Sequence, residues 1–278
     1  MARRIRRCLI PLFFMKSRIL LALAFALCLA LNTSAQTSAQ TPAPDARVYE
    51  LRIYTTNAGK LPNLLSRFRD HTMRLFERHG MRNIGYFTPR EPSEGADTVL
   101  YYFLEHASRE AATASWAGFR ADPEWVAVRA ASEVGGVILA KPPEAIFFKA
   151  TDYSPPIKTG GSFEQPRVFE LRRYTAAEGK LPALHAFFRN RVLESFGRME
   201  MTGIGFWDPI DADKGAGKGF TYLLAFPSRE AAAQAWTALR SDSYFVSARA
   251  EASRDGSLTA DGGIQSLFLV PVDFSPLK

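Results

Sequence analysis

The sequence predicts an α+β fold in which two tandem βαββαβ units place their sheets face to face as one barrel. The first observation behind this prediction is an internal repeat: residues 48–55 read VYELRIYT, and residues 168–175, 120 positions later, read VFELRRYT. The second is that each copy alternates strand-like and helix-like hydrophobic patterns. The third is the length of the repeat, which is too long for a solenoid and fits a small domain.

Each copy begins with a strand and then a helix. Residues 48–55 alternate in polarity and are rich in β-forming residue types, which predicts a strand. The sequence GKLP follows at 59–62, and Pro62 suits the first turn of a helix, where its missing N–H has no partner to lose. Apolar residues then recur at helical spacing as far as His79, which predicts a helix over about residues 61–79.

The second half of each copy adds two strands, a helix and a last strand. Residues 82–89 and 98–106 read as strands with a turn between them. Ser108 is a suitable N-cap for the helix that follows, which breaks at Asp122-Pro123 and then continues. Residues 145–150 form the last predicted strand. The resulting order, β-α-β-β-α-β, is that of a ferredoxin-like unit.

The repeat also predicts how the two units meet. A four-stranded sheet of this kind has helices on one face only, so its other face needs a cover, and the second copy is the nearest one. We therefore expect a pseudo-twofold dimeric α+β barrel formed within a single chain. The predicted domains are residues 47–154 and 167–278, joined by a linker at 155–166 that is rich in proline and glycine.

The N-terminal residues read as a targeting segment. Basic residues precede an apolar run at 19–31, and small residues at 33–35 suit cleavage, so residues 1–35 are predicted to be a secretory signal peptide. We expect an exported protein, periplasmic or secreted, with no membrane attachment after cleavage; an uncleaved anchor is the alternative. Residues 36–46 lack an apolar period and are predicted to be a disordered lead-in.

Composition excludes several classes of function. Removing the leader lowers the formal net charge from +7 to +1, so the basic charge does not indicate a nucleic-acid partner. Cys8 and Cys28 both lie in the leader, which leaves no disulfide, thiolate nucleophile or cysteine metal site in the rest of the chain. The histidines lack metal-ligand spacing, and there is neither a phosphate-binding loop nor a GxSxG motif. We therefore predict no metal and no cofactor.

A set of short motifs resembles a known family. The set comprises YELR at 49–52, GKL at 59–61, RHG at 78–80 and DPEW at 122–125, with partners at 169–172 and 179–181. Together they resemble the NIPSNAP family over nearly the whole chain after the leader. The resemblance implies the dimeric α+β barrel superfamily, which includes cofactor-free monooxygenases, isomerases, haem peroxidase-like proteins and proteins with no known reaction.

The sequence departs from the family pattern at two places. The third strand of the family often carries a histidine where Tyr102 and Tyr222 stand in this chain. The sequence DPEW at 122–125 becomes DSYF at 242–245 in the second copy. The resemblance therefore does not extend to a function that needs those family residues.

The first strand of each copy supplies the candidate site. Alternation places Tyr49, Leu51 and Ile53 on one face, expected to pack on the helices, and a polar row on the other, expected to face the second sheet. Tyr residues of the third strands are expected to reach the same interior. The candidates to line an inter-sheet cavity are Glu50, Arg52, Tyr54, Tyr102, Glu170, Arg172, Tyr174 and Tyr222.

Two interpretations of this polar row remain open. In the functional one, arginine holds a carboxylate or enolate of a small organic ligand, and tyrosine orients or protonates it. In the structural one, the Glu50–Arg52 and Glu170–Arg172 pairs fix how the sheets meet. The leading hypothesis is binding of a small organic ligand in the inter-sheet cavity, or service as an interaction scaffold for a protein partner.

Two further functions stand as alternatives. One is a cofactor-independent monooxygenase or isomerase that uses the arginines and tyrosines of the two rows on an enolisable substrate. The other is haem binding through His185, although a hydrogen-bonded core histidine is the favoured explanation of this residue. Trp116 and Trp236, which recur at the repeat offset, are attributed to packing of helix on sheet.

Overall fold

The structure is a computed structural model that describes residues 46–160 and 167–278. The predicted signal peptide, residues 1–35, lies outside the described residues, and so does the lead-in at 36–46 apart from its last residue. Within the described ranges, none of the helices combines the length and the apolar character that a membrane crossing requires.

The first copy follows the predicted order of elements. Its Ser108 hydroxyl accepts a hydrogen bond from the amide of Ala111 and so caps the fourth helix, as its sequence position predicts. The elements are β1 (Val48–Thr55), α2 (Leu61–Arg67), a π-helical turn (Phe68–Thr72), α3 (Met73–Arg78), β2 (Arg82–Pro89), β3 (Val99–His106), α4 (Arg109–Ala121), α5 (Pro123–Ser132) and β4 (Glu144–Ala150).

The second copy repeats this order, including the π-helical turn in the first helix. Because both copies have the π-helical turn at the same place, the turn is a feature of the βαββαβ unit itself. The elements are β5 (Val168–Ala176), α6 (Leu181–Phe187), the π-helical turn (Phe188–Val192), α7 (Leu193–Arg198), β6 (Thr202–Pro209), β7 (Gly219–Phe226), α8 (Arg229–Ser241), α9 (Ser243–Ala252) and β8 (Thr259–Pro271).

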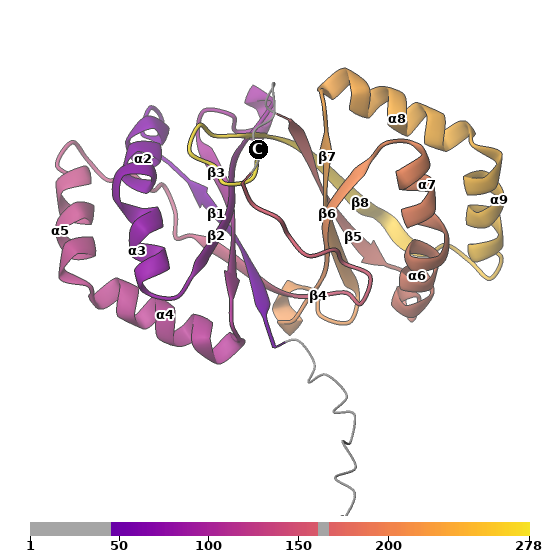
Figure 1. Cartoon of the computed structure of the whole chain (residues 1–278), viewed down its shortest axis with the longest axis horizontal. Helices are drawn as coiled ribbons and strands as arrows, with labels where there is room; N and C mark the ends of the chain where they lie inside the picture. The colour runs from indigo at the N-terminus through magenta and orange to yellow at the C-terminus, as the bar shows by residue number, and fades with distance from the viewer. Residues whose placement is uncertain (1–45, 161–166) are drawn as a thin grey trace, which may run out of the picture. The chain divides into compact units, whose positions relative to one another are not determined.

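The eight strands form one closed antiparallel barrel, which confirms the predicted fold. Their order is β1-β3-β2-β8-β5-β7-β6-β4, so each copy contributes four neighbouring strands. The two copies join where β2 pairs with β8, Phe87 opposite Pro271, and where β4 pairs with β6, Phe148 opposite Pro209. Figure 1 shows helices α2–α5 outside one half of the barrel and α6–α9 outside the other.

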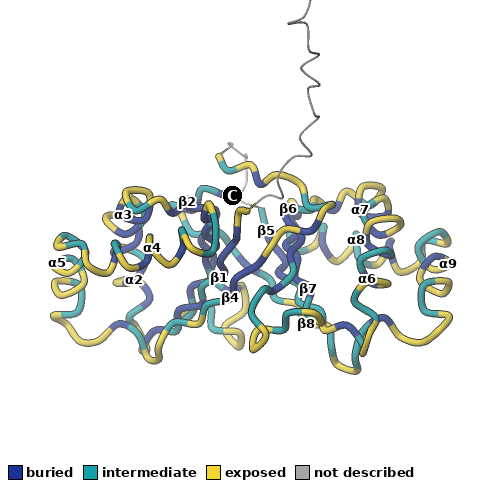
Figure 2. Tube along the Cα trace, turned by 90° about the horizontal axis from the view of Figure 1, so that it is seen from below, coloured by how far each residue is buried: buried dark blue, intermediate teal, exposed yellow. Residues whose placement is uncertain are grey.

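Large apolar side chains from both copies fill the barrel interior. Figure 2 shows buried backbone along the strands and exposure on the outer sides of the helices. The Trp207 ring stacks on Phe103 with 5.4 Å between ring centroids, and Phe87 contacts Phe169 at 4.9 Å, so rings of the two copies meet directly. The interior cluster includes Tyr49, Leu51, Ile53, Phe87, Phe103, Phe148, Phe169, Leu171, Trp207, Leu223 and Leu269.

The tail that follows the last strand of each copy packs on the other copy. Tyr153 belongs to the core of the second copy, and Phe274 packs against the core of the first. Ser154 Oγ accepts from the Phe206 amide at 3.0 Å, and Ser275 Oγ accepts from the Tyr86 amide at 2.9 Å. The crossed tails make each copy part of the other's fold.

We expect Ser275→Ala to lower the free energy of unfolding by about 1–3 kcal/mol, because it leaves the buried Tyr86 amide without an acceptor. Urea unfolding followed by circular dichroism measures this change. Ser93→Ala, at an exposed turn position, is the control. Equal midpoints for the two variants would show that the crossed tail contributes little.

Candidate functional site

Glu50 on β1 is fully buried and accepts hydrogen bonds from three side chains. Arg52 Nη1 donates to its Oε1 at 3.0 Å, while Trp116 Nε1 and His106 Nε2 donate to its Oε2 at 2.7 and 2.9 Å. The Arg52 guanidinium also lies over the Trp116 ring, with Cζ 4.4 Å from the centroid, and its Nη2 donates to the Tyr54 hydroxyl at 3.4 Å. Because Trp116 belongs to α4, this network joins strand β1 to the helix layer.

The second copy builds a corresponding network around Glu170, in which Ser266 takes the place of His106 as the third donor. Arg172 Nη1 and Ser266 Oγ donate to its Oε1 at 2.7 and 2.6 Å, and Trp236 Nε1 donates to its Oε2 at 2.6 Å. Arg172 Cζ again lies 4.4 Å from the Trp236 ring centroid, and its Nη2 donates to the Tyr174 hydroxyl at 3.2 Å. Strand β5 is thus joined to α8 as β1 is joined to α4.

The predicted direction of the polar rows is wrong. Each row faces its own helix layer, where Trp116 or Trp236 meets it, and Tyr49, Leu51 and Ile53 point into the barrel instead. A buried indole N–H needs an acceptor, which the glutamate supplies, and aromatic rings already fill the space between the sheets. The eight candidates therefore form two separate groups, one in each copy, and line no common inter-sheet cavity.

The first group has a well-defined charge state. Burial by itself would raise the pKa of Glu50, but the hydrogen bond from His106, the charge of Arg52 and the hydrogen bond from Trp116 together hold this pKa below its ordinary value. Glu50 is therefore ionised at neutral pH and only accepts hydrogen bonds. The paired charges that the structural interpretation predicted are present, but they join sheet to helices.

In the second copy, a cavity of about 240 Å³ lies between the sheet and the helix layer. Arg172, Tyr174 and Tyr222 provide the polar groups of its sheet side. Much of the remaining wall is aromatic, which suits a flat ring. The aromatic residues are Phe187, Phe188, Phe196, Trp236 and Phe245.

The hydroxyl groups in this cavity leave one donor free. Tyr174 Oη accepts from Arg172 Nη2 at 3.2 Å and from Tyr222 Oη at 3.0 Å. Burial and the neighbouring Tyr174 raise the pKa of Tyr222 well above its ordinary value, so Tyr222 stays a neutral donor. With both lone pairs of its oxygen occupied, Tyr174 can direct its own hydrogen toward an oxygen atom of a ligand.

Aromatic rings occupy the corresponding space in the first copy. Phe119 and Trp125 lie 4.4 Å apart between ring centroids, and Phe119 also contacts Phe76 at 4.8 Å. At the repeat offset, Phe119 becomes Leu239 and Trp125 becomes Phe245, which are both smaller and both line the cavity. Two smaller side chains in the second copy thus leave open the space that aromatic rings fill in the first.

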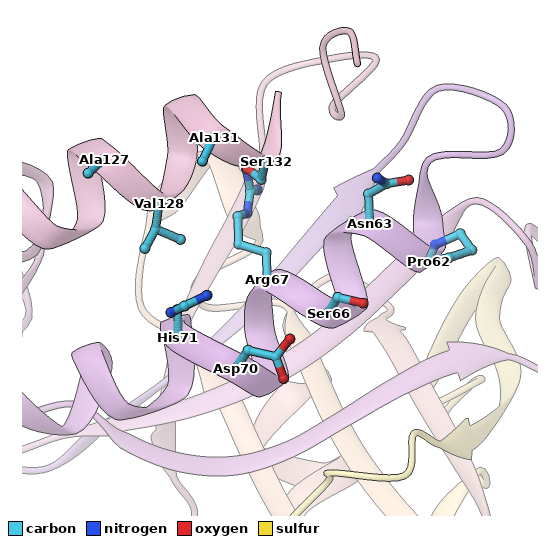
Figure 3. A pocket seen from close by; sticks show the side chains of 10 residues that line it. All are labelled: Pro62, Asn63, Ser66, Arg67, Asp70, His71, Ala127, Val128, Ala131 and Ser132. Carbon is cyan, nitrogen blue, oxygen red and sulfur yellow. The ribbon is translucent and has the colours of Figure 1, made fainter. Parts of the chain in front are cut away.

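A third difference concerns Arg67, which Phe187 replaces in the second copy. Arg67 is buried, its Nη1 donates to Ser132 Oγ at 3.2 Å, and its guanidinium lies 5.3 Å from the Trp125 ring centroid. Figure 3 shows Arg67 extending from α2 toward Ser132 on α5 across an outer groove of about 640 Å³. The first copy therefore has a groove between helices α2 and α5, whereas the second copy has an aromatic cavity between its helices and its sheet.

The comparison with protein families agrees with the repeat. The NIPSNAP family model matches residues 49–155 and again residues 169–276, which together make up most of the chain. The chain belongs to the NIPSNAP family. A search of curated proteins finds no match.

Solved structures resemble this NIPSNAP chain in fold. A Fusobacterium nucleatum protein described as a presumed monooxygenase has a TM-score of 0.57 at 10% identity, over 85% of this chain and 100% of its own. A Lactobacillus acidophilus protein with the same description has a TM-score of 0.50 at 13% identity, over 81% and 94%. A NIPSNAP-like domain protein from Burkholderia xenovorans has a TM-score of 0.36 at 18% identity, over 44% and 99%.

His185 lies outside the cavity of the second NIPSNAP copy. The Tyr153 hydroxyl lies 2.7 Å from its Nδ1, and the Asp208 carboxylate lies 3.1 Å from its Nε2. Both ring nitrogens therefore face side chains of the protein, and we base no haem site on this residue. In the described part of the chain, no cluster of His, Cys, Asp and Glu has the arrangement of a metal site.

The sequence prediction missed most of the residues that shape the cavity. Leu239, Phe245 and Phe187 come from the helices, whereas all candidates had been drawn from strands. The missed signal is the asymmetry of the repeat: the polar row and its tryptophan are kept in both copies, but Phe119 and Trp125 are not. A comparison of the differences between the copies, as well as of their identities, would have indicated that the second copy has room for a cavity.

Proposed function

We propose that the second NIPSNAP copy binds a small, single-ring organic molecule in its sheet–helix cavity. The observation that carries this proposal is the free hydroxyl hydrogen of Tyr174, held beside Arg172 and Tyr222 in an otherwise largely aromatic and aliphatic space. A volume of about 240 Å³ lies just below the usual range of ligand cavities, which favours a ligand with one ring over a ligand with two.

The lining also indicates the chemistry of the buried end of the ligand. Arg172 and the Tyr174 hydroxyl present positive charge and a donor, so the complementary group is an oxygen acceptor such as a phenol, enol or carbonyl. Glu170 already pairs with Arg172, which limits the need for a full negative charge at this end. We therefore use 4-methylphenol as the probe.

We expect Tyr174→Phe to weaken binding of 4-methylphenol about three- to tenfold, because it removes one hydrogen bond to the ligand. Ligand-observed NMR and calorimetric titration of the full chain measure this change. Toluene, which has no oxygen, should bind both proteins equally, and Tyr54→Phe in the first copy should leave both affinities unchanged. Failure of both probes to bind the wild-type chain would sink the proposal.

A second candidate function is cofactor-independent oxygenation of a ligand in this cavity. It is favoured by the chain of hydroxyl groups ending at Arg172, which can stabilise a developing enolate or phenolate, and by fold neighbours described as presumed monooxygenases. With hydroquinone as probe, conversion to hydroxybenzoquinone and water, with one atom of ¹⁸O₂ incorporated into the organic product, would support it if this conversion is lost in Tyr174→Phe. Oxygen uptake that yields only benzoquinone and hydrogen peroxide would count against it. Export of the chain stays a prediction that fractionation of cells can test.

A further inference from the structure

The cavity of the second copy opens through a charged mouth. A hollow of about 460 Å³ lies beside α9 and shares part of its lining with the inner cavity. The shared residues are Arg240, Phe245, Arg249, Ser253 and Ser257. Two arginines thus stand where a ligand in the cavity would meet solvent.

These arginines have no acidic partner among the described residues. The side chain of Arg240 donates only to Thr237 Oγ1, at 3.3 Å, and Arg249 has no carboxylate within ion-pair distance. By contrast, Arg198 on α7 is paired with Asp242. The mouth therefore carries positive charge that the protein itself does not neutralise.

In the first copy, the arginine that corresponds to Arg249 is paired with a carboxylate. There Arg129 Nε lies 3.6 Å from Glu133 Oε2, and the same carboxylate lies 3.5 Å from Arg67 Nη1. At the repeat offset, Arg129 is kept as Arg249, but Glu133 becomes Ser253. The second copy has therefore kept the arginine and lost its acid, at the same place where the cavity opens.

We infer that the ligand of the second copy is an elongated organic acid, whose ring lies in the cavity and whose carboxylate lies at the mouth between Arg240 and Arg249. A carboxylate would be costly to bury among the rings of the inner cavity, whereas at the mouth it meets two unpaired guanidinium groups. The inference rests on the proposed function, because it assigns the second end of a ligand whose first end reaches Tyr174.

The test compares 4-hydroxyphenylpropionate with its neutral amide, which share the phenol ring and the chain length. We expect the full-length protein to bind the acid more tightly, and Ser253→Glu to weaken binding of the acid about fivefold more than binding of the amide. Arg249→Gln should act in the same way, and added salt should reduce the preference, because the mouth is exposed. Calorimetric titration measures all affinities.

Arg129→Gln in the first copy is the matched control and should change neither affinity. Equal binding of acid and amide, unaffected by Ser253→Glu, would overturn the inference and leave the proposed cavity intact. If neither probe binds, the proposed function is wrong and the inference falls with it. Equal loss of binding of the acid and the amide in Ser253→Glu, with unchanged circular dichroism, would also contradict the inference. It would show that residue 253 affects the shared phenol ring and not the carboxylate.

Discussion

Glu50→Ala should lower the free energy of unfolding by about 3–5 kcal/mol, which is a large part of the stability of most domains. The variant leaves Arg52 as a buried charge without its partner, and it leaves the N–H groups of His106 and Trp116 without an acceptor. Urea unfolding followed by tryptophan fluorescence measures the change. Because the barrel is closed across both copies, we expect a single transition whose midpoint shifts.

Glu144→Ala is the control for this prediction. Glu144 pairs with Lys141 at the surface, with about half of each side chain exposed, so its removal should cost less than about 1 kcal/mol. If the two variants lost equal stability, the buried network would not hold strand β1 to helix α4 in the way described.

The same network predicts a dependence on pH. The folded-state pKa of Glu50 lies below its ordinary value of 4.5, so its contribution is fully present above that value and is lost as the pH falls through the lower, folded-state pKa. The wild type should therefore lose more stability than Glu50→Gln between about pH 5 and pH 2. Parallel stability profiles for the two proteins would contradict this assignment.

Most of the fold could be predicted because two independent copies report the same pattern. Alternation predicted strand β1 at its observed bounds, residues 82–89 were predicted as the strand that the structure shows as β2, and Ser108 marked the start of α4. The closure of the barrel followed from one argument, that a sheet with helices on one face needs a cover on the other. The π-helical turns left no comparable pattern in the sequence. The tails did recur as DYSP at 152–155 and DFSP at 273–276, but nothing in that motif indicated that they cross to the other copy.

The direction of the polar row could not be predicted in the same way, because both faces of β1 are buried. Alternation separates Glu50 and Arg52 from Leu51, but it does not say which set meets the helices. The decisive group is the indole N–H of Trp116 on α4, which needs a buried acceptor. The joint recurrence of Trp116 and Glu50 in both copies was visible in the sequence, but it was read as two separate facts.

Leu239→Phe combined with Phe245→Trp should abolish binding of 4-methylphenol, weakening it about a hundredfold or more. The two substitutions give the second copy the rings that Phe119 and Trp125 place in the first, where they pack 4.4 Å apart. Since this chain already folds around that pair of rings, we expect the free energy of unfolding to change by less than about 1.5 kcal/mol. Calorimetric titration and urea unfolding of the same preparation measure both quantities.

Leu239→Met, which conserves volume, is the matched control and should keep the affinity of the wild type. The comparison tests the contribution of the cavity volume to binding apart from that of the network around Glu170, because Arg172, Tyr174 and Glu170 are left unchanged. A filled variant that still binds 4-methylphenol with full affinity would place the ligand elsewhere, with the outer groove beside Arg67 as the next site to test. The filled variant is also expected to lose its preference for 4-hydroxyphenylpropionate over the amide, together with its binding of 4-methylphenol. That result would show that the ring and the carboxylate of the ligand are recognised at the same cavity and mouth of the second copy.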